Sequence, residues 1–431
     1  MFSAPQPSQL SNDPVVLRFR PTVAHQYVQS IYDENPGLES QGFLEQQEFL
    51  DSFHLPFTGG LAFSLNRIGL PTLDILYDVP QLQAAWERDS GETLDGNDRR
   101  LSLAFAAIEQ FRPSVILEQS FGLFKPDTLE MIRRRFPFIK VISMHVGFPL
   151  VGYQIPFGKS PEYDIVFATC KGFVGDFLRT GVQNVIVVPH GFDARIVVDE
   201  PRQEPTYPLV FSGSSGFGSG TTHWSRYEYL EALCERTPIT CFLTEPELPS
   251  LGYAPDSLST RLRQQSLDMI RRNMPNLGLG APRHPRASLI RRPPKSWKPP
   301  REPLSARYPE NCLPPVFGLD MYSVLASSGI TFHRGHDVEG TCSSALRIYE
   351  ATGVGSMLLT DSKQDLDDLF VEGKEYVAYD TVEDAVDKAL YYLRNEEERA
   401  EIASAGQRRT LADHTLDRRA EQFAEAFENR L

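Results

Sequence analysis

Short apolar runs alternate with amphipathic segments along the chain from about residue 101. Compact β-branched runs bounded by turn residues are typical of buried strands, and apolar residues at helical spacing indicate helices. The predicted strands of the first series are Val115–Leu117, Lys140–Ser143, Asp164–Ala168 and Val185–Val188, and its helices are Leu101–Phe111, Thr128–Phe136 and Gly172–Arg179. Because strands that alternate with helices form parallel βαβ units, this series predicts a Rossmann-like layer.

A second series of the same kind begins directly after the Pro-rich, polar segment 201–208. Its predicted strands are Leu209–Ser212, Ile239–Leu243, Gly329–Phe332 and Met357–Leu359, and its helices are Arg226–Glu235, Met321–Ser327, Ala345–Ala351 and Val382–Leu393. Two pairs resemble helix caps, Ser225 with Glu228 and Thr381 with Asp384. We therefore predict a second α/β domain.

The chain is too long for one hydrophobic core, so at least two domains are expected. The predicted divisions are a helical N-terminal appendage over 1–50, an N-terminal Rossmann-like domain over 51–200, a C-terminal Rossmann-like domain over 201–395 with an insertion over 245–316, and charged C-terminal helices over 396–431.

Composition narrows the class of protein. The net charge of −14 argues against nucleic acid as a partner. The five cysteines are widely spaced and odd in number, which predicts neither a disulfide framework nor a zinc site and fits a reducing cytoplasm. No N-terminal signal pattern and no apolar stretch of about 20 residues is present, so we expect a soluble cytoplasmic protein.

One segment of the insertion is strongly basic. Between Arg283 and Arg307 stand eight basic residues and one acid, together with several prolines and Trp297. Such a tract cannot form regular structure, so the simplest interpretation is a solvated loop. The alternative is a docking segment for an anionic acceptor, a partner protein or the inner membrane surface, where the protein would be peripheral.

Two junctions between a strand and a helix could hold phosphate. Glycines Gly213, Gly216 and Gly218 follow the first strand of the second series and lack the dinucleotide-binding spacing, so the alternative is a flexible turn. Arg226 lies at the start of the next helix. Further on, the helix that begins near Ser343 and Ser344 would offer free N–H groups to a phosphate.

Arg347 and Glu350 lie three residues apart and therefore on one face of that helix. The sequence Leu346-Arg-Ile-Tyr-Glu-Ala-Thr-Gly-Val-Gly355, with Pro189-His-Gly-Phe-Asp193 before it and Glu372-Gly-Lys-Glu-Tyr-Val-Ala-Tyr379 after it, resembles GT-B glycosyltransferases of group 1, most closely the family that includes the CgeB-like proteins.

This resemblance implies an α/β protein of the GT-B fold, with two Rossmann-like domains facing a central cleft and C-terminal helices that cross back. It implies that the second domain binds a nucleotide sugar without a metal ion. The donor would contact Gly213, Ser214, Arg226, Ser343, Ser344 and Arg347, with Glu350 on the ribose. The alternative for Glu350 is a surface acid paired with Arg347.

The Glu-x7-Glu motif of many GT-B enzymes is incomplete at the expected spacing. Cys342 stands eight residues before Glu350, where the motif has its first acid, so the stereochemistry stays open. An inverting enzyme needs a base for the acceptor hydroxyl, and the candidates are His145, at the end of a predicted strand, and His54, ahead of Gly59-Gly60. Both could instead be structural.

One short polar loop contains His333, His336 and Asp337, a set that could ligate a metal ion. A loop at the end of a strand without a metal ion is the commoner case, and it is the interpretation that we favour here.

The leading functional hypothesis is a hexosyltransferase-like enzyme that moves a sugar from a UDP, GDP or dTDP donor to a hydroxyl acceptor, which is a glycan, a lipid-linked or a protein-linked group. The alternatives are a nucleotide-sugar epimerase of GT-B shape and a catalytically silent protein that binds a sugar nucleotide or a partner.

Overall fold

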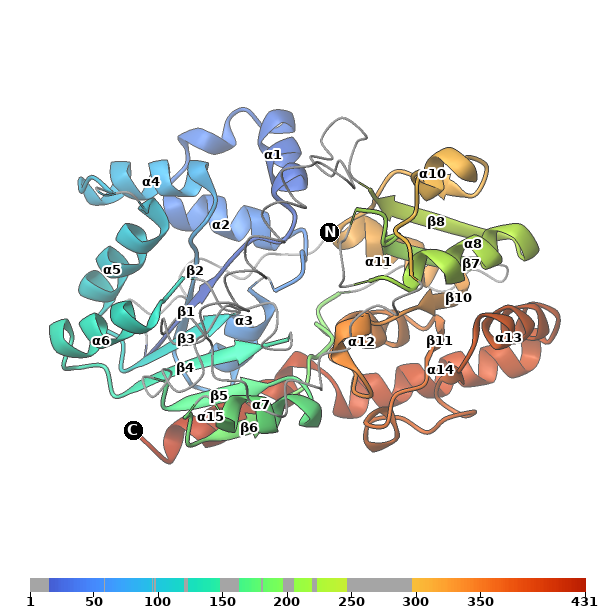
Figure 1. Cartoon of the computed structure of the whole chain (residues 1–431). Helices are drawn as coiled ribbons and strands as arrows, with labels where there is room; N and C mark the ends of the chain where they lie inside the picture. The colour runs from blue at the N-terminus through green and yellow to red at the C-terminus, as the bar shows by residue number, and fades with distance from the viewer. Residues whose placement is uncertain are drawn as a thin grey trace, which may run out of the picture.

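The computed structural model describes residues 15–431 except 58, 95, 97, 120–122, 148–162, 180, 197–204, 219–222 and 246–296. The described chain forms two α/β halves that lie side by side, each built on a parallel sheet (Figure 1). The two predicted Rossmann-like layers are confirmed. Half of the predicted boundary segment 201–208 and most of the insertion lie outside the described residues.

Six described strands form the first sheet in the order β2-β1-β3-β4-β5-β6, and all neighbouring pairs are parallel. They are β1 Val16–Arg20, β2 Thr72–Leu76, β3 Val115–Gln119, β4 Val141–Val146, β5 Ile165–Ala168 and β6 Val185–Val187. The strand order reverses between β1 and β3. Ligands bind at the carboxyl ends of strands beside such a reversal.

Strand β1 lies within the first sheet, and residues 16–20 therefore do not belong to an appendage. The sequence of β1 does not look like that of a buried strand, because it contains two arginines. Arg18 and Arg20 are both 2 % exposed and share the carboxylate of Asp74 at 2.9 and 3.0 Å, while Arg20 also pairs with Asp51 at 2.5 Å. Paired carboxylates thus allow charged residues in a buried strand.

Helices cover both faces of the first sheet. Leu61 and Leu65 of α3 pack with Phe423 and Phe427 of α15 on one face, and α1, α2 and α4 to α7 cover the other. These helices are α1 His25–Glu34, α2 Phe43–Asp51, α3 Gly60–Arg67, α4 Pro80–Ser90, α5 Arg99–Phe111, α6 Pro126–Arg135, α7 Val174–Arg179 and α15 Leu416–Glu428, with short 3₁₀ turns η2 Leu38–Ser40 and η4 Lys171–Phe173.

The second sheet has the order β12-β11-β10-β7-β8-β9 among the described strands, again all parallel. The strands are β7 Tyr207–Ser214, β8 Ile239–Thr244, β9 Cys312–Leu313, β10 Ser328–His333, β11 Met357–Asp361 and β12 Val377–Tyr379. The order reverses between β7 and β10, which places the glycine-rich loop and the loop after His333 at the reversal.

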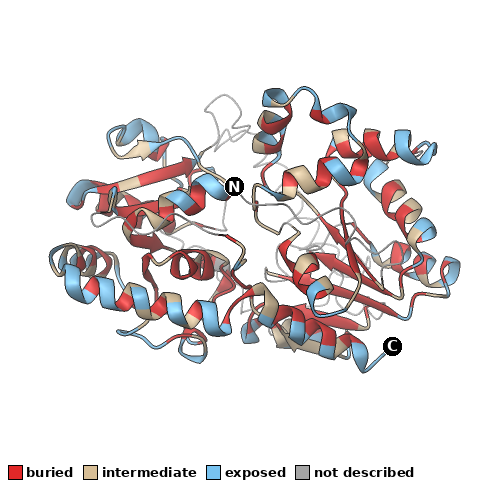
Figure 2. Cartoon of the chain, turned by 180° about the vertical axis from the view of Figure 1, so that it is seen from behind, coloured by how far each residue is buried: buried red, intermediate tan, exposed pale blue. Residues whose placement is uncertain are grey.

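One face of the second sheet packs against α8 and α13, and the other against α11 and α12. The helices of this half are α8 Arg226–Arg236, α10 Leu304–Arg307, α11 Gly318–Ala326, α12 Arg347–Gly353, α13 Val382–Arg394 and α14 Glu396–Asp413, with 3₁₀ turns η7 Asp337–Glu339 and η8 Leu366–Asp368. The strands are buried, and the outer sides of the helices are exposed (Figure 2).

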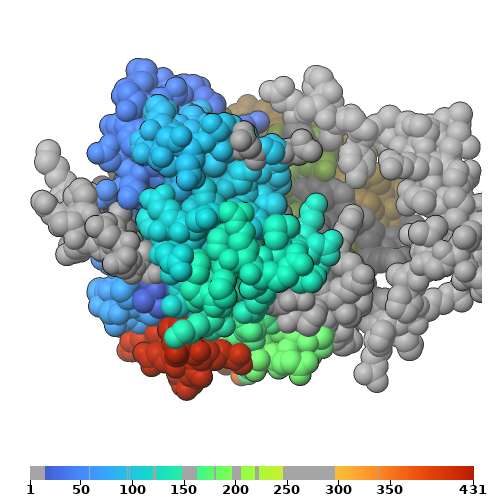
Figure 3. All heavy atoms as spheres, turned by 90° about the vertical axis from the view of Figure 1, so that its left-hand side faces the viewer, coloured from blue at the N-terminus to red at the C-terminus, as the bar shows by residue number. Residues whose placement is uncertain are grey.

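The described part of the chain begins with β1 in the first half and ends with α15 against the same half. Helix α14 packs on the second half, and α15 then crosses back and lies against the first half, as the side view shows in red (Figure 3). The predicted return of the C-terminal helices to the first half is confirmed for α15, whereas α14 stays on the second half. No helix among the described residues is both long and apolar enough to span a membrane.

Candidate functional site

A pocket lies between the two halves, near the carboxyl ends of β1, β3 and β4. The first half contributes Arg18, Gln119 and the segments 54–57 and 189–193; the second half contributes Tyr322 and Leu346, and the crossing helix α15 contributes Arg419 and Phe423. Because both halves and the crossing helix supply its walls, the pocket corresponds to the central cleft predicted from the sequence.

His54 and Asp193 form a pair in the wall of this pocket. The Nδ1 atom of His54 lies 3.2 Å from Oδ2 of Asp193, and Arg195 donates to the same carboxylate from 2.6 Å. Burial alone would raise the pKa of Asp193, but the hydrogen bonds from Arg195 and His54 outweigh it and lower that pKa. Asp193 is therefore an anion that holds the His54 ring in one orientation.

The glycine pair after His54 makes this arrangement fit. A Cβ atom at Gly60 would lie 2.6 Å from Oδ2 of Asp193, and one at Gly59 would lie 2.5 Å from Oδ2 of Asp51. Both carboxylates thus approach the backbone where a side chain would block them.

His145 lines the same pocket but has an oxygen atom beside each ring nitrogen. Nε2 lies 3.1 Å from the carbonyl oxygen of Val188, and Nδ1 lies 3.3 Å from Oε1 of Gln119. Burial lowers its pKa to about 3, and neighbouring His190 adds to this effect. A neutral ring carries a single N–H, so only one of these two oxygens can accept from it. Because the ring is fully buried between them, it fits a structural role better than that of a base, and the geometry favours His54.

Arg347, which is half-buried, and Glu350, which is buried, form an ion pair on α12. Nη1 of Arg347 lies 2.8 Å from Oε2 of Glu350, and the side chains are 18 % and 4 % exposed. The hydroxyl of Tyr322, a wall residue of the pocket, donates to Oε1 of Glu350 at 3.3 Å, and Arg347 donates to the carbonyl of Ser212 at the end of β7. The pair therefore links the pocket to the end of β7.

Ser343 and Ser344 precede α12, which begins at Arg347 rather than at Ser343. The backbone N–H of Ser343 donates to Asp365 at 2.8 Å, and the hydroxyl of Ser344 donates to the carbonyl of Gly147 in the other half at 2.8 Å. The predicted phosphate-binding groups are thus close to the cleft but already have protein partners.

Glu339 is a candidate that sequence reasoning missed. It is fully buried, and its Oε1 accepts hydrogen bonds from His336 at 2.8 Å and from Ser344 at 2.7 Å. Oε2 has no hydrogen-bond partner among the described residues. Burial would raise the pKa of Glu339, but the bond from His336 outweighs it and lowers that pKa. Glu339 precedes Glu350 by eleven residues, so a search at a spacing of eight passes over it.

The chain turns at three glycines with positive φ, of which Gly213 lies at the end of β7 and the other two lie in the glycine-rich loop that follows. Gly213, Gly216 and Gly218 have φ values of 150°, 91° and 73°. Arg226 braces the loop by donating to the carbonyls of Ser214 at 3.1 Å and Arg334 at 2.5 Å. Burial lowers its pKa to about 10. Gly213, Ser214 and Arg226 are therefore brought together as predicted, with the guanidinium directed at backbone carbonyls.

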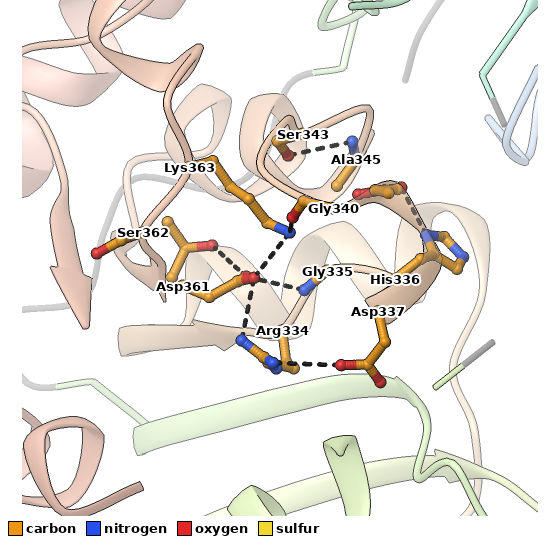
Figure 4. Close-up of polar contacts among 12 residues, drawn as sticks. Arg334, Gly335, His336, Asp337, Gly340, Ser343, Ala345, Asp361, Ser362 and Lys363 are labelled. Carbon is orange, nitrogen blue, oxygen red and sulfur yellow. Dashed lines mark hydrogen bonds and ion pairs between the residues drawn. The ribbon is translucent and has the colours of Figure 1, made fainter. Parts of the chain in front are cut away.

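The loop after β10 is held by a network of charges (Figure 4). Asp361 accepts from the backbone N–H of Gly335 at 2.9 Å and pairs with Arg334 at 3.1 Å and Lys363 at 3.2 Å. Burial would raise the pKa of Asp361, but Lys363 and Arg334 outweigh it and lower it to about 2. Arg334 also reaches Asp337 at 3.3 Å. The network positions the loop that leads to Glu339.

The histidines of this loop point to different partners. His333 bonds Thr360 at 2.9 Å, whereas His336 bonds Glu339 and stacks on His223 at a ring distance of 4.3 Å. Within the described part of the chain, no group of metal-ligating atoms includes His333, His336 or Asp337.

Comparisons with known proteins agree with this architecture. Residues 291–425 match the model of a family described as glycosyl transferase-like. No curated protein matches the sequence.

Solved structures match over almost the whole chain at low identity. HepE of Anabaena, solved with UDP and glucose, has a TM-score of 0.54 at 12 % identity, covering 96 % of this chain and 99 % of its own. Sucrose-phosphate synthase of Thermosynechococcus elongatus reaches 0.53 at 10 % identity, with 97 % and 98 % covered. A glycosyltransferase of Rickettsia africae reaches 0.51 at 11 % identity, with 97 % and 99 % covered.

These structures share the fold, and the family match lies in the half that the sequence assigns to the donor. Together they support the prediction of a glycosyltransferase of the GT-B fold. The chain has the GT-B fold, and its residues 291–425 carry a glycosyl transferase-like sequence.

Proposed function

We propose that the protein transfers a hexose from a nucleoside diphosphate sugar to a hydroxyl acceptor in the pocket between its halves. One observation carries the proposal. A histidine–carboxylate pair from the first half, His54 with Asp193, and Tyr322 from the second half, which bonds Glu350, line the same pocket. An acceptor-activating group and a donor-binding group thus meet where the substrates would react.

His54 is the proposed general base. Asp193 would hold Nδ1–H and leave Nε2 to accept the acceptor proton, and its negative charge would stabilise the imidazolium that forms. His145, the other predicted base, would keep the wall of the pocket in place through its contacts with Val188 and Gln119.

The second half is the proposed donor site. Glu350 would bind the ribose hydroxyls, and Arg347 and Arg226, with Gly213, Ser214, Ser343 and Ser344, would surround the diphosphate. Negative charge builds on the leaving diphosphate in the transition state, and cations stabilise it. Since arginines can supply this charge, we expect transfer without a metal ion at the diphosphate. Glu339, with its free Oε2, would accept a hydrogen bond from the donor sugar.

UDP-hexoses are the first donors to test among UDP, GDP and dTDP sugars, because the HepE structures contain UDP-glucose or its parts. We place the protein in the CgeB-like group of these enzymes and in the cytoplasm. The basic segment 283–307 is the proposed contact with the inner membrane surface or a partner protein; its residues 283–296 lie outside the described part.

Ligand binding is the first test. Thermal unfolding would be followed with UDP, GDP, dTDP and their hexoses, since a ligand at 100 times its dissociation constant adds about 2.7 kcal/mol of stability. A shift with one nucleotide, followed by acceptor-dependent release of that nucleotide and a glycosylated product, supports the proposal. Binding without turnover favours the catalytically silent protein, and no shift at millimolar ligand contradicts donor binding.

The role of His54 has its own test. The substitution His54→Gln should lower kcat by about 10²- to 10⁴-fold, as expected for a lost general base, and leave the donor-induced melting shift unchanged. His25→Gln is the matched control, because the side chain of His25 is 62 % exposed and His25 is not among the residues that line the pocket. An unchanged kcat in His54→Gln would rule out this residue as the base.

A further inference from the structure

Two cysteines from different halves of the molecule face each other near the cleft. Cys170 follows β5 in the first half, and Cys342 precedes α12 in the second. Their sulfur atoms and a carboxylate oxygen of Asp365 all lie within 4.8 Å of one another. Cysteine spacing along the chain predicts no such group, because the ligands come from distant segments that only the interface of the two halves brings together.

The surroundings hold these residues in place. The backbone N–H of Ser343 donates to both oxygens of Asp365, at 2.8 and 3.1 Å, so the carboxylate is fixed beside Cys342. Gly172 leaves room for the thiol, since a Cβ atom there would overlap Sγ of Cys342. Lys171 pairs with Asp368 across the same interface at 2.8 Å. The group is therefore part of a built contact between the halves.

We propose that Cys170, Cys342 and Asp365 bind one Zn²⁺ ion that joins the two halves. Two thiolates and a carboxylate are ligands that zinc accepts, with water completing a tetrahedron. Such a tetrahedron places its ligand atoms about 3.6–3.8 Å apart, so atoms that lie within 4.8 Å of one another need to draw together by at most about 1.2 Å. Each thiol would lose its proton to solvent as its Zn–S bond forms.

A zinc site accounts for the presence of Asp365 beside the two cysteines. A disulfide between Cys170 and Cys342 would need only the two sulfurs, and the nearby carboxylate would oppose the thiolate that starts thiol–disulfide exchange. A divalent cation instead is attracted by all three groups. Cys342 is only partly buried, which gives the ion a route from solvent, whereas Cys170 and Asp365 are 3 % and 8 % exposed.

The site contains none of the proposed donor-binding residues, although Cys342 adjoins Ser343 in the chain and Asp365 accepts a hydrogen bond from the Ser343 N–H. It would tie the loop of Ser343 and Ser344 to the end of β5, close to the contact that Ser344 makes with Gly147. Bound zinc would therefore hold the halves together and would not act on the diphosphate.

The test is titration of the reduced, chelator-treated full-length protein with Zn²⁺ alone, in competition with a chromophoric chelator. We expect one ion per chain and a higher melting temperature. Replacing Zn²⁺ by Co²⁺ should give the near-ultraviolet charge-transfer band of thiolate ligation. Cys342→Ser and Asp365→Asn should each weaken binding by at least the 10- to 100-fold typical of losing a supporting contact.

A matched control exists in the second half. Cys312 is partly buried on β9, opposite Cys241, so it belongs to another group of thiols. Cys312→Ser should leave zinc binding unchanged. Loss of the ion in Cys312→Ser but not in Cys342→Ser would overturn the proposal. So would the absence of tight binding, or a Cys170–Cys342 disulfide in the metal-free protein that forms in preference to the zinc complex.

Discussion

Arg347 and Glu350 are each other's partners as well as proposed donor ligands. Because Glu350 is buried and Arg347 is half-buried, removal of either side chain leaves the other without its counter-charge, which costs stability as well as binding. A single substitution therefore cannot separate the two roles. The conservative double variant can, because it removes both charges and keeps similar shapes.

We predict that Arg347→Ala and Glu350→Ala each weaken donor binding by about 1.5–3 kcal/mol, the value of a hydrogen bond to a charged group. Each should also lower the free energy of unfolding. The double variant Arg347→Met with Glu350→Gln should recover most of the stability but not the donor affinity. Calorimetric donor titration and urea unfolding measure the two quantities, and full donor affinity in the double variant would remove the pair from the site.

Some site residues could be predicted from the sequence because they interact with residues that are close to them along the chain. Arg347 and Glu350 share a helix face at any helical geometry, and the structure brings them together as predicted. Glu339 was missed because the loop before α12 is longer than the motif assumes. Asp193 as the partner of His54 was also missed, since the two residues are 139 positions apart and only the folded chain brings them within 3.2 Å.

At the scale of elements, the glycine-rich loop depends on backbone geometry at Gly216. This residue has a φ of 91°, and a Cβ atom there would lie 2.7 Å from the carbonyl oxygen of His223. We predict that Gly216→Ala lowers the free energy of unfolding by about 1–3 kcal/mol, as strained backbone does, and impairs donor binding through the displaced loop.

Two other glycines serve as controls for this prediction. Gly69 has a φ of 89° with open space around it, so Gly69→Ala reports strain without a clash. Gly37 has a φ of −75° and open space, so Gly37→Ala should be neutral or slightly stabilising. Urea unfolding of the three variants should rank them Gly216, Gly69, Gly37 by loss of stability. Equal effects at all three positions would contradict the assigned cause.

Helix caps show where local patterns suffice and where they fail. The hydroxyl of Thr381 accepts from the N–H of Asp384 at 3.1 Å, so this cap was predictable. Ser225 makes no such cap bond, because its hydroxyl donates to Asp337 from a distant loop. Strand β1 was unpredictable for a similar reason: only the fold brings Asp74 to Arg18. Local signals fail where a distant partner satisfies the polar group.

At the scale of the molecule, the crossing chain fixes the relation of the halves. The backbone of Phe192 exchanges hydrogen bonds with His414 and Leu416, each at 2.8 Å, just before α15. Arg419 of α15 donates to the carbonyl of His190 at 2.9 Å. The loop that carries Asp193 is therefore anchored to the crossing segment, so the pocket and the crossing form one structural unit.

The buried histidines make the whole molecule sensitive to acid. Burial lowers the pKa values of His145, His190 and His333 to about 3, 4 and 3. The unfolded chain binds protons at these residues near the ordinary value of about 6.5, whereas the folded protein does not. Stability is therefore unaffected above pH 7 and falls as the pH drops below 6.5. Each histidine contributes up to about 1.4 kcal/mol per pH unit.

We predict that the free energy of unfolding is constant from pH 8 to 7 and decreases steadily towards pH 5, as measured by urea unfolding. Asp365, whose pKa burial raises to about 6, acts in the opposite direction, as do Asp51 and Asp78. Burial also lowers the pKa values of His223 and His414, so five histidines outweigh these three carboxyls. His333→Asn should flatten the decrease by the share of one histidine. A free energy of unfolding that stays level or rises on acidification would mean that these rings become protonated inside the folded protein.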